Sequence, residues 1–388
     1  MKGESARGMF DLPVSGNLSL NGDKNNIVRI GAERIIERMG EYFMTPKEIF
    51  KKAIRLEPPP RIPVTLLSGG VWVYNQQGMS LQDSFDLPPE RSAEITIKAN
   101  EAVRSDLVWA AAGCNNLVLR AVGAKVNFHR PGVASDVAEP LLDNPYDIDK
   151  INLDDINDDP GLNAMLENAK ILKDSIGNDI MIGISQWGPL TLAGLLLGTE
   201  KFMKLIIKDK PAVHYMLECT THMVYRYWDL FLDAGAEYIS QAEPFASGDM
   251  ISKRQFVEFV VPNLTKTNDL IGDKPFAKMI HICGDTTNFL ELIPETGADA
   301  FSMDYKVDLA AAREVLDGKI AFFGHMDPVA VMQMATPEKV REECLRCVKD
   351  AQGEKGGYFM MPGCDIPPAV PIENIRAMVD VAYSYLEN

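Results

Sequence analysis

The sequence predicts an α/β protein built on a single (β/α)8 TIM barrel. Eight short apolar runs alternate with longer amphipathic patterns over residues 44–388, which is typical of βαβ units around a parallel sheet. No Gly-x-Gly-x-x-Gly follows a predicted strand, and no Gly-rich loop ends in Lys-Ser or Lys-Thr. These absences disfavour an open sheet that binds a dinucleotide or a nucleoside triphosphate, so a closed barrel is preferred.

An N-terminal extension is expected to precede the barrel. Residues 1–43 are mixed in character and include an amphipathic stretch at 27–39 that can form a helix. The barrel domain has a firm start, because Thr45 can cap a helix, Pro46 suits its first position and Glu48 can return the capping-box bond. We therefore divide the chain into a helical extension at 1–43 and a (β/α)8 barrel at 44–388.

The elements of the barrel follow from the apolar periodicity. The predicted strands are residues 62–67, 107–112, 180–185, 238–242, 277–282, 300–303, 320–323 and 358–361. The predicted helices between and after them include residues 211–234, 253–271, 287–296, 309–316, 337–351 and 372–386. The Asp-rich segment 127–160 departs from the alternation and is interpreted as a solvated excursion on the surface.

Composition and charge exclude several classes of protein. Among 388 residues, 55 are acidic and 39 basic, and the formal charge of −16 disfavours nucleic acid or an anionic membrane as a partner. No apolar run reaches the roughly 20 residues of a membrane span, and no export signal is visible, so we expect a cytoplasmic protein. Six cysteines in a chain of this length indicate reduced thiols or metal ligands rather than a disulfide framework.

Three residues at predicted strand ends have the chemistry of a zinc site. His281 and Cys283 stand two positions apart at the end of one strand, so their side chains leave the same face. Cys364 follows the last predicted strand, and all strands of a parallel barrel end at one rim. Two thiolates and an imidazole suit a catalytic zinc with an open fourth position. His-x-Cys is a weak motif, however, and the spacing equally fits buried cysteines and a core histidine.

Three longer segments resemble the uroporphyrinogen decarboxylase superfamily. They are residues 281–287 (His-Ile-Cys-Gly-Asp-Thr-Thr), 363–368 (Gly-Cys-Asp-Ile-Pro-Pro, followed by Pro-Ile-Glu-Asn-Ile at 371–375) and 188–194 (Gly-Pro-Leu-Thr-Leu-Ala-Gly). More narrowly, they look like its branch of methylcobamide:coenzyme M methyltransferases and related corrinoid-dependent methyltransferases. The resemblance runs from about Met44 to the C-terminus. It implies a (β/α)8 barrel with His281, Cys283 and Cys364 as zinc ligands.

The same resemblance implies methyl transfer between a corrinoid and a small substrate. Zinc would activate a thiol to attack a methyl group on cobalt, or would polarise a methylated compound so that cobalt takes the methyl group. No Asp-x-His-x-x-Gly pattern is present, so the corrinoid is expected to arrive free or on a partner corrinoid protein. The small molecule is a thiol or a methoxylated compound, and a homodimer is left open.

Two alternatives to methyl transfer remain. A decarboxylase of this superfamily holds a substrate with eight carboxylates and presents arginines after the first strand, whereas residues 62–90 contain no Lys or Arg. The other alternative is a non-catalytic barrel that binds a corrinoid or another tetrapyrrole, with inert cysteines. Zinc content distinguishes this second alternative from the enzyme.

Further candidate residues lie near the predicted rim. Trp72, Tyr74 and Trp187 are candidates for a cofactor- or substrate-binding wall, which would suit an aromatic methyl ether, or they are packing residues. Glu243 and His325 end the fourth and seventh predicted strands as candidate catalytic residues. Glu243 is a fourth ligand, a proton acceptor or a structural carboxylate. His325 could bind substrate or zinc, although relatives usually carry Asn there.

Other acidic and sulfur-containing residues are interpreted as structural. Asp285 and Asp304 either orient His281 or cap the following helices, and capping is preferred. Cys344 and Cys347 are predicted to lie on one side of a helix as packing residues.

Overall fold

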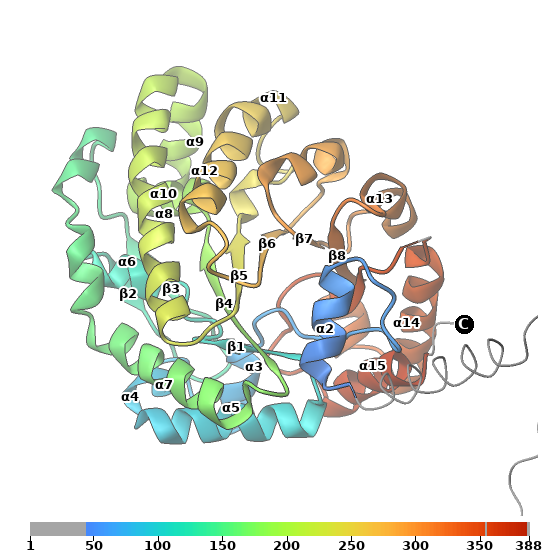
Figure 1. Cartoon of the computed structure of the whole chain (residues 1–388). Coiled ribbons are helices and arrows are strands. Elements are labelled where there is room, and N and C mark those ends of the chain that lie inside the picture. The colour runs from blue at the N-terminus through green and yellow to red at the C-terminus, as the bar shows by residue number, and fades with distance from the viewer. Residues whose placement is uncertain (1–43, 354, 386–388) are drawn as a thin grey trace, which may run out of the picture. The chain divides into compact units, whose positions relative to one another are not determined.

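The computed structural model describes residues 44–353 and 355–385. The predicted extension at 1–43, with its amphipathic stretch at 27–39, lies outside these residues. The described chain confirms the predicted α/β barrel class, with parallel strands inside and helices outside (Figure 1). Among the described residues, no helix has both the length and the apolar character that crossing a membrane requires.

Seven parallel strands form one sheet in the order β1-β4-β5-β6-β7-β8-β9. Their bounds are β1 (Leu107–Ala110), β4 (Met181–Trp187), β5 (Tyr238–Ala242), β6 (Ala277–Ile282), β7 (Ala300–Met303), β8 (Ala321–Met326) and β9 (Tyr358–Pro362). Three predicted strands, at 238–242, 277–282 and 300–303, have the bounds that the structure gives to β5, β6 and β7. Buried apolar runs between helices therefore located these strands well.

The first predicted strand, residues 62–67, is reduced to one bridge between Val64 and Met360 of β9. Its backbone nevertheless bonds to both edges of the sheet. Thr65 N donates to Met360 O at 3.1 Å on one side, and Asp106 N, just before β1, donates to Val64 O at 2.9 Å on the other. Pro63 has no N–H and cannot extend the ladder, which explains why the eighth barrel position is so short.

The helices mostly match the predicted ranges. They are α2 (Pro46–Ile54), α3 (Gly70–Asn75), α4 (Asp83–Asp86), α5 (Pro89–Val103), α6 (Leu117–Ala121), α7 (Pro160–Ile176), α8 (Pro189–Leu197), α9 (Thr199–Lys208), α10 (Lys210–Asp233), α11 (Lys253–Gln255), α12 (Val261–Ile271), α13 (Leu309–Leu316), α14 (Pro337–Ala351) and α15 (Ile372–Ser384). The predicted capping box of Thr45 and Glu48 is present at the start of α2.

Two predicted helices are interrupted where proline removes a backbone donor. The prediction at 253–271 becomes α11, a π-helical segment η4 (Phe256–Val260) and α12, whose second residue is Pro262. The prediction at 287–296 becomes two 3₁₀ segments, η5 (Thr287–Leu292) and η6 (Pro294–Thr296). Proline has no N–H to donate to the carbonyl four residues earlier, so the regular α-helical hydrogen-bond pattern is lost near each proline.

The segment at 127–160 is largely exposed, as predicted. It holds part of a hairpin of β2 (Lys125–Asn127) and β3 (Asp136–Glu139), followed by the 3₁₀ segments η1 (Pro145–Lys150) and η2 (Leu153–Asn157). Outside this segment, a π-helical segment η7 (Pro328–Gln333) follows β8. These irregular segments after strands shape the carboxyl-terminal rim.

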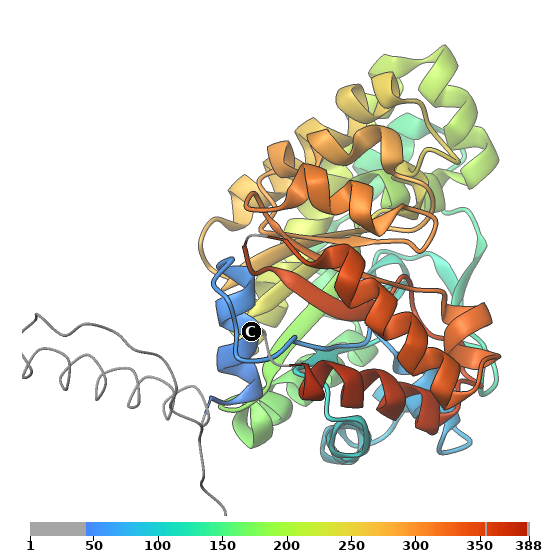
Figure 2. The same cartoon turned by 90° about the vertical axis from the view of Figure 1, so that its right-hand side faces the viewer.

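Apolar side chains fill the amino-terminal half of the barrel. Phe323 and Phe359 stack with ring centroids 4.0 Å apart, and Phe50 of α2 packs on Phe359 at 4.8 Å and on Tyr238 at 5.1 Å. Helix α2, blue in Figure 2, is tied to the start of β4 by a bond from Lys47 N to Asp179 O at 2.8 Å. The barrel is therefore closed by α2 at this end, which leaves the opposite rim for a site.

A buried ion pair joins the short first segment to β1. Arg61 makes two hydrogen bonds to Asp106, at 2.8 and 2.6 Å, and Val64 N donates to the same carboxylate at 2.8 Å. Asp106 is fully buried, and the Arg61 guanidinium also lies 3.8 Å from the ring centroid of Tyr383 on α15. This pair holds together the two segments that close the barrel.

We predict that Asp106→Ala lowers the free energy of unfolding by about 3–5 kcal/mol, because it leaves Arg61 buried without its counter-charge. Urea denaturation followed by circular dichroism measures this change. Asp380→Ala is the control, since its pair with Arg104 is about half exposed and should change stability by about 1 kcal/mol or less. Equal losses in the two variants would contradict the assigned role of Asp106.

Candidate metal centre

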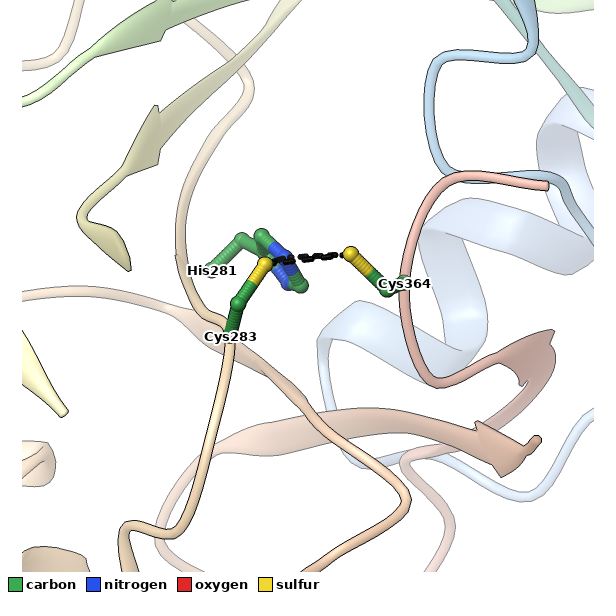
Figure 3. Close-up of side chains that lie close together, drawn as sticks. All are labelled: His281, Cys283 and Cys364. Carbon is green, nitrogen blue, oxygen red and sulfur yellow. Dashed lines mark hydrogen bonds between the residues drawn. The ribbon is translucent and has the colours of Figure 1, made fainter. Parts of the chain in front are cut away.

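His281, Cys283 and Cys364 converge at the carboxyl-terminal rim, as Figure 3 shows. His281 lies near the end of β6 and Cys283 directly follows that strand, while Cys364 comes from the loop after β9. His281 Nε2 is 2.9 Å from Cys283 Sγ and 3.8 Å from Cys364 Sγ, and the two sulfurs are 3.0 Å apart. The sequence placed these residues at one rim, and the fold brings their donor atoms together.

The chemistry of these three donors fits zinc. Their atoms all lie within 4.8 Å of one another. Ligands of a tetrahedral zinc with bonds of about 2.0–2.3 Å stand roughly 3.5–3.8 Å apart, so the cluster is close to the required size. Two sulfurs and one imidazole nitrogen are soft and borderline donors that zinc prefers, and three protein donors leave a fourth position for substrate.

Hydrogen bonding between the donors shifts the pKa values of the two cysteine thiols in opposite directions. Cys364 accepts from Cys283 and lies near His281, which lowers the pKa of the Cys364 thiol to about 4. The bond to Cys364, together with burial, raises the pKa of the Cys283 thiol. The cluster thus already stabilises one thiolate, the form in which cysteine binds a metal.

Ser302 orients the imidazole. Its Oγ lies 2.8 Å from His281 Nδ1, which leaves Nε2 facing the sulfurs. Asp304 instead accepts from the backbone N–H groups of Gly284 and Lys306, at 2.9 and 3.0 Å. Asp285 accepts from Thr287 N at 2.9 Å. Both aspartates bond to backbone N–H groups and not to His281, but the prediction that they cap the following helices is wrong, because Asp308 caps α13 and the N-cap of η5 is Thr286. Ser302 is the partner of His281 that sequence reasoning missed.

The signal for Ser302 was the pairing of neighbouring strands. Trp187, Ala242, His281, Ser302 and Phe323 are paired successively across β4 to β8. Side chains at paired positions of a parallel sheet share a face, so this row sets an aromatic, a methyl, an imidazole and a hydroxyl side by side. Aligning the predicted strand ends would have placed Ser302 beside His281.

A cavity of about 140 Å³ adjoins the three donors. Its lining comprises Leu67, Ser68, Val71, Gly113, Asn115, Ala134, Ser135, Ser185, Trp187, Ala242, His281, Cys283, Cys364 and Asp365. Trp187 therefore belongs to this site. Burial raises the pKa of Asp365 to about 7, and its Oδ1 accepts from Gly69 N at 2.8 Å, which ties the Cys364 loop to the start of α3.

Trp72 and Tyr74 do not line this cavity. Both are buried on α3, where Trp72 Nε1 donates to Val370 O at 2.8 Å and the Tyr74 hydroxyl lies 2.6 Å from Ser92 Oγ. These contacts correspond to the packing alternative. Helix α3 begins at Gly70, shortly after the first predicted strand, and turns Trp72 and Tyr74 into the core, where they line a separate cavity of about 60 Å³.

Glu243 and His325 also lie outside the donor cluster. The buried Glu243 carboxylate accepts from Leu190 N and Thr191 N at 2.9 Å, which caps the start of α8, and burial raises its pKa to about 7. His325 is buried with Nδ1 3.6 Å from Cys347 Sγ of α14, and burial lowers its pKa. The side-chain contacts of Glu243 and His325 are with surrounding helices, and Glu243 meets His281 only through its backbone N–H, which donates to His281 O at 2.8 Å.

The fold and the donor cluster at its rim define a (β/α)8-barrel enzyme. The family model described as uroporphyrinogen decarboxylase (URO-D) matches residues 45–385, and the chain belongs to this family.

Two relatives of this chain carry different names. The methylcobamide:CoM methyltransferase MtbA of Methanosarcina acetivorans is 27% identical over 354 residues, covering 89% of this chain and 99% of that protein. A uroporphyrinogen decarboxylase of Chlorobium phaeovibrioides is 25% identical, covering 87% and 97%. A solved methyltransferase from Methanosarcina mazei has the same fold, with a TM-score of 0.78 and 24% identity over 88% of this chain and 98% of that one.

We predict that Ser302→Ala weakens zinc binding by about 10–100-fold, because the His281 ring loses the partner that fixes its orientation. Competition with a chromophoric chelator measures the affinity. Ser240→Ala is the control, since Ser240 is equally buried on the neighbouring β5 but its Oγ has no hydrogen-bond partner. Unchanged zinc affinity in Ser302→Ala would argue against this role.

Proposed function

We propose that this chain is a zinc-dependent methyltransferase that moves a methyl group between a corrinoid and a small substrate. The corrinoid is presented by a partner protein, and the substrate reacts through a thiol sulfur or through the oxygen of a methyl ether. The observation that carries the proposal is the convergence of His281, Cys283 and Cys364 beside a cavity at the open rim of the barrel. The relatives named methylcobamide:CoM methyltransferases support it.

Sequence identity alone does not separate methyl transfer from decarboxylation, because relatives with both names are about equally similar. The site favours methyl transfer on two grounds. Among the described residues, the cavity lining contains no Lys or Arg that could balance a polycarboxylate. It does contain three soft metal donors, which a non-catalytic tetrapyrrole-binding barrel would not need.

Each residue of the centre has a role in this proposal. His281, Cys283 and Cys364 would hold zinc, which when bound supplies the Lewis acidity that lowers the pKa of a thiol or polarises an ether oxygen. Ser302 fixes the ring of His281. Asp365 holds the Cys364 loop against Gly69. The buried part of the cavity wall, which includes Leu67, Val71 and Ala242, would limit water around the reacting atoms.

In the direction of thiol methylation, the substrate loses its proton to solvent and its sulfur attacks the methyl carbon of the methylcorrinoid. The sulfur–carbon bond forms as the cobalt–carbon bond breaks, and the electron pair of the broken bond stays on the corrinoid. In the opposite direction, the reduced corrinoid attacks the methyl carbon and the heteroatom leaves with the electron pair. The chain must therefore keep its rim accessible to the partner that carries the corrinoid.

Metal analysis of the wild type beside Cys364→Ala tests this proposal. We expect about one zinc per wild-type chain, with loss of most of the metal in the variant because one of three donors is removed. Methyl transfer from methylcobalamin to a panel of thiols should fall in parallel. Circular dichroism confirms that the variant remains folded.

Cys219→Ala is the matched control, because Cys219 is a half-buried cysteine of α10 outside the cluster. It should keep both zinc and activity. A wild-type chain that binds no zinc under reducing conditions would contradict the proposed function. Methyl transfer that survives in the zinc-free variant would contradict the role of the three donors.

A further inference from the structure

The wall of the cavity beside the metal donors is mostly apolar, and most of its polar groups are uncharged. Hydroxyl and amide groups are contributed by Ser68, Asn115, Ser135 and Ser185. Apart from the metal donors, Asp365 is the one ionisable residue among the described residues of the lining, which include no Lys or Arg. A negatively charged substrate group would lose hydration here without gaining a counter-charge.

Two basic side chains near the rim are paired with acids, and Arg130, on the loop that carries the lining residues Ala134 and Ser135, is exposed and does not line the cavity. Lys306, in the loop after β7, is exposed and lies 2.8 Å from Asp249. Arg120 of α6 makes two hydrogen bonds to Asp159, at 2.9 and 2.6 Å. Neither lines the cavity. The chain's formal charge of −16 further disfavours an anionic ligand.

The pairing of strands leaves room for a flat group. Trp187 and His281 are separated by one strand position, which Ala242 occupies, so their backbones stand roughly 10 Å apart. The methyl side chain of Ala242 leaves the space between indole and imidazole open. Trp187 Nε1 donates to Asn116 Oδ1 at 2.7 Å, which fixes the orientation of the indole wall.

The cavity is large enough for about one ring. Its volume is about 140 Å³. An enclosed apolar cavity of roughly 150 Å³ in another protein holds benzene, which sets the scale. A six-membered ring with small substituents therefore fits beside the donors.

We infer that the small substrate of this site is an uncharged molecule with one planar ring, which lies against Trp187 with its thiol or methyl ether directed at His281, Cys283 and Cys364. This inference rests on the proposed function for the identity of the reacting group. The contacts that select the substrate are the indole face, the gap at Ala242 and the neutral hydroxyl and amide groups of the wall.

Binding of matched thiol pairs to the zinc-loaded full chain tests the inference. Calorimetry compares thiophenol with 4-mercaptobenzoate and 2-mercaptoethanol with 2-mercaptoethanesulfonate. The neutral member of each pair should bind tighter by about tenfold or more, and thiophenol should bind tighter than 2-mercaptoethanol. Equal or tighter binding of the anionic members, or no binding of any thiol by the zinc-loaded protein, would overturn the inference.

Three variants test which lining residues select neutral aromatic thiols. Trp187→Ala should weaken the binding of thiophenol by about tenfold and leave the binding of 2-mercaptoethanol and the zinc content nearly unchanged. Trp187→Phe should retain most of the affinity for thiophenol. Ala134→Lys places a cation at an exposed position of the lining and should improve binding of 4-mercaptobenzoate several-fold. Failure of either expected change would count against the assigned binding mode.

Methyl transfer from methylcobalamin to each bound thiol separates the two proposals. Neutral thiols that bind selectively but are not methylated would contradict the thiol-methylating direction of the proposed function and leave the inferred ligand class intact. Anionic thiols that bind tightly and are methylated would support methyl transfer and overturn the inferred ligand class.

Discussion

Successive pairing of parallel strands is the constraint on which the site depends. The row from Trp187 through Ala242 and His281 to Ser302 exists because β4, β5, β6 and β7 pair at these positions. A one-residue shift of β6 would turn His281 toward the surrounding helices and remove it from both Ser302 and the sulfurs. The donor cluster, its orienting hydroxyl and the substrate cavity are thus consequences of a single register.

Closure of the barrel maintains that register. The sheet has two edges, β1 and β9, and residues 62–67 connect them with only a few backbone bonds. The Arg61–Asp106 pair compensates for this short segment by fixing Val64 from the side. Since Cys364 follows β9 and His281 lies on β6, the distance between them depends on how the sheet curves to close.

The rim combines strong structural anchoring with an open centre. Glu243, Asp304, Asp365 and Asp327 each accept backbone N–H groups and thereby hold the loops after β5, β7, β9 and β8. Carboxylates at strand ends are candidates for catalytic groups from sequence alone, yet oxygens of these four accept hydrogen bonds from the backbone. Apart from Asp365, the groups that line the cavity are the three candidate metal donors and uncharged side chains, an arrangement that suits chemistry at a bound metal better than acid–base chemistry by paired carboxylates.

The sequence by itself determined the barrel class and most strand positions, because buried apolar runs mark parallel strands. The shared rim of the strand ends, together with the family resemblance, also predicted that His281, Cys283 and Cys364 lie together, and the structure brings their donor atoms together. Tertiary structure decided which other residues join them. Trp187 lines the cavity beside the donors, whereas Trp72 and Tyr74 are buried residues of α3 that do not. Ser302 lies beside His281, whereas the side chains of Glu243 and His325 contact neighbouring helices. Periodicity along one segment locates a strand end, but strand pairing and loop direction, which depend on contacts distant in sequence, decide what each side chain meets.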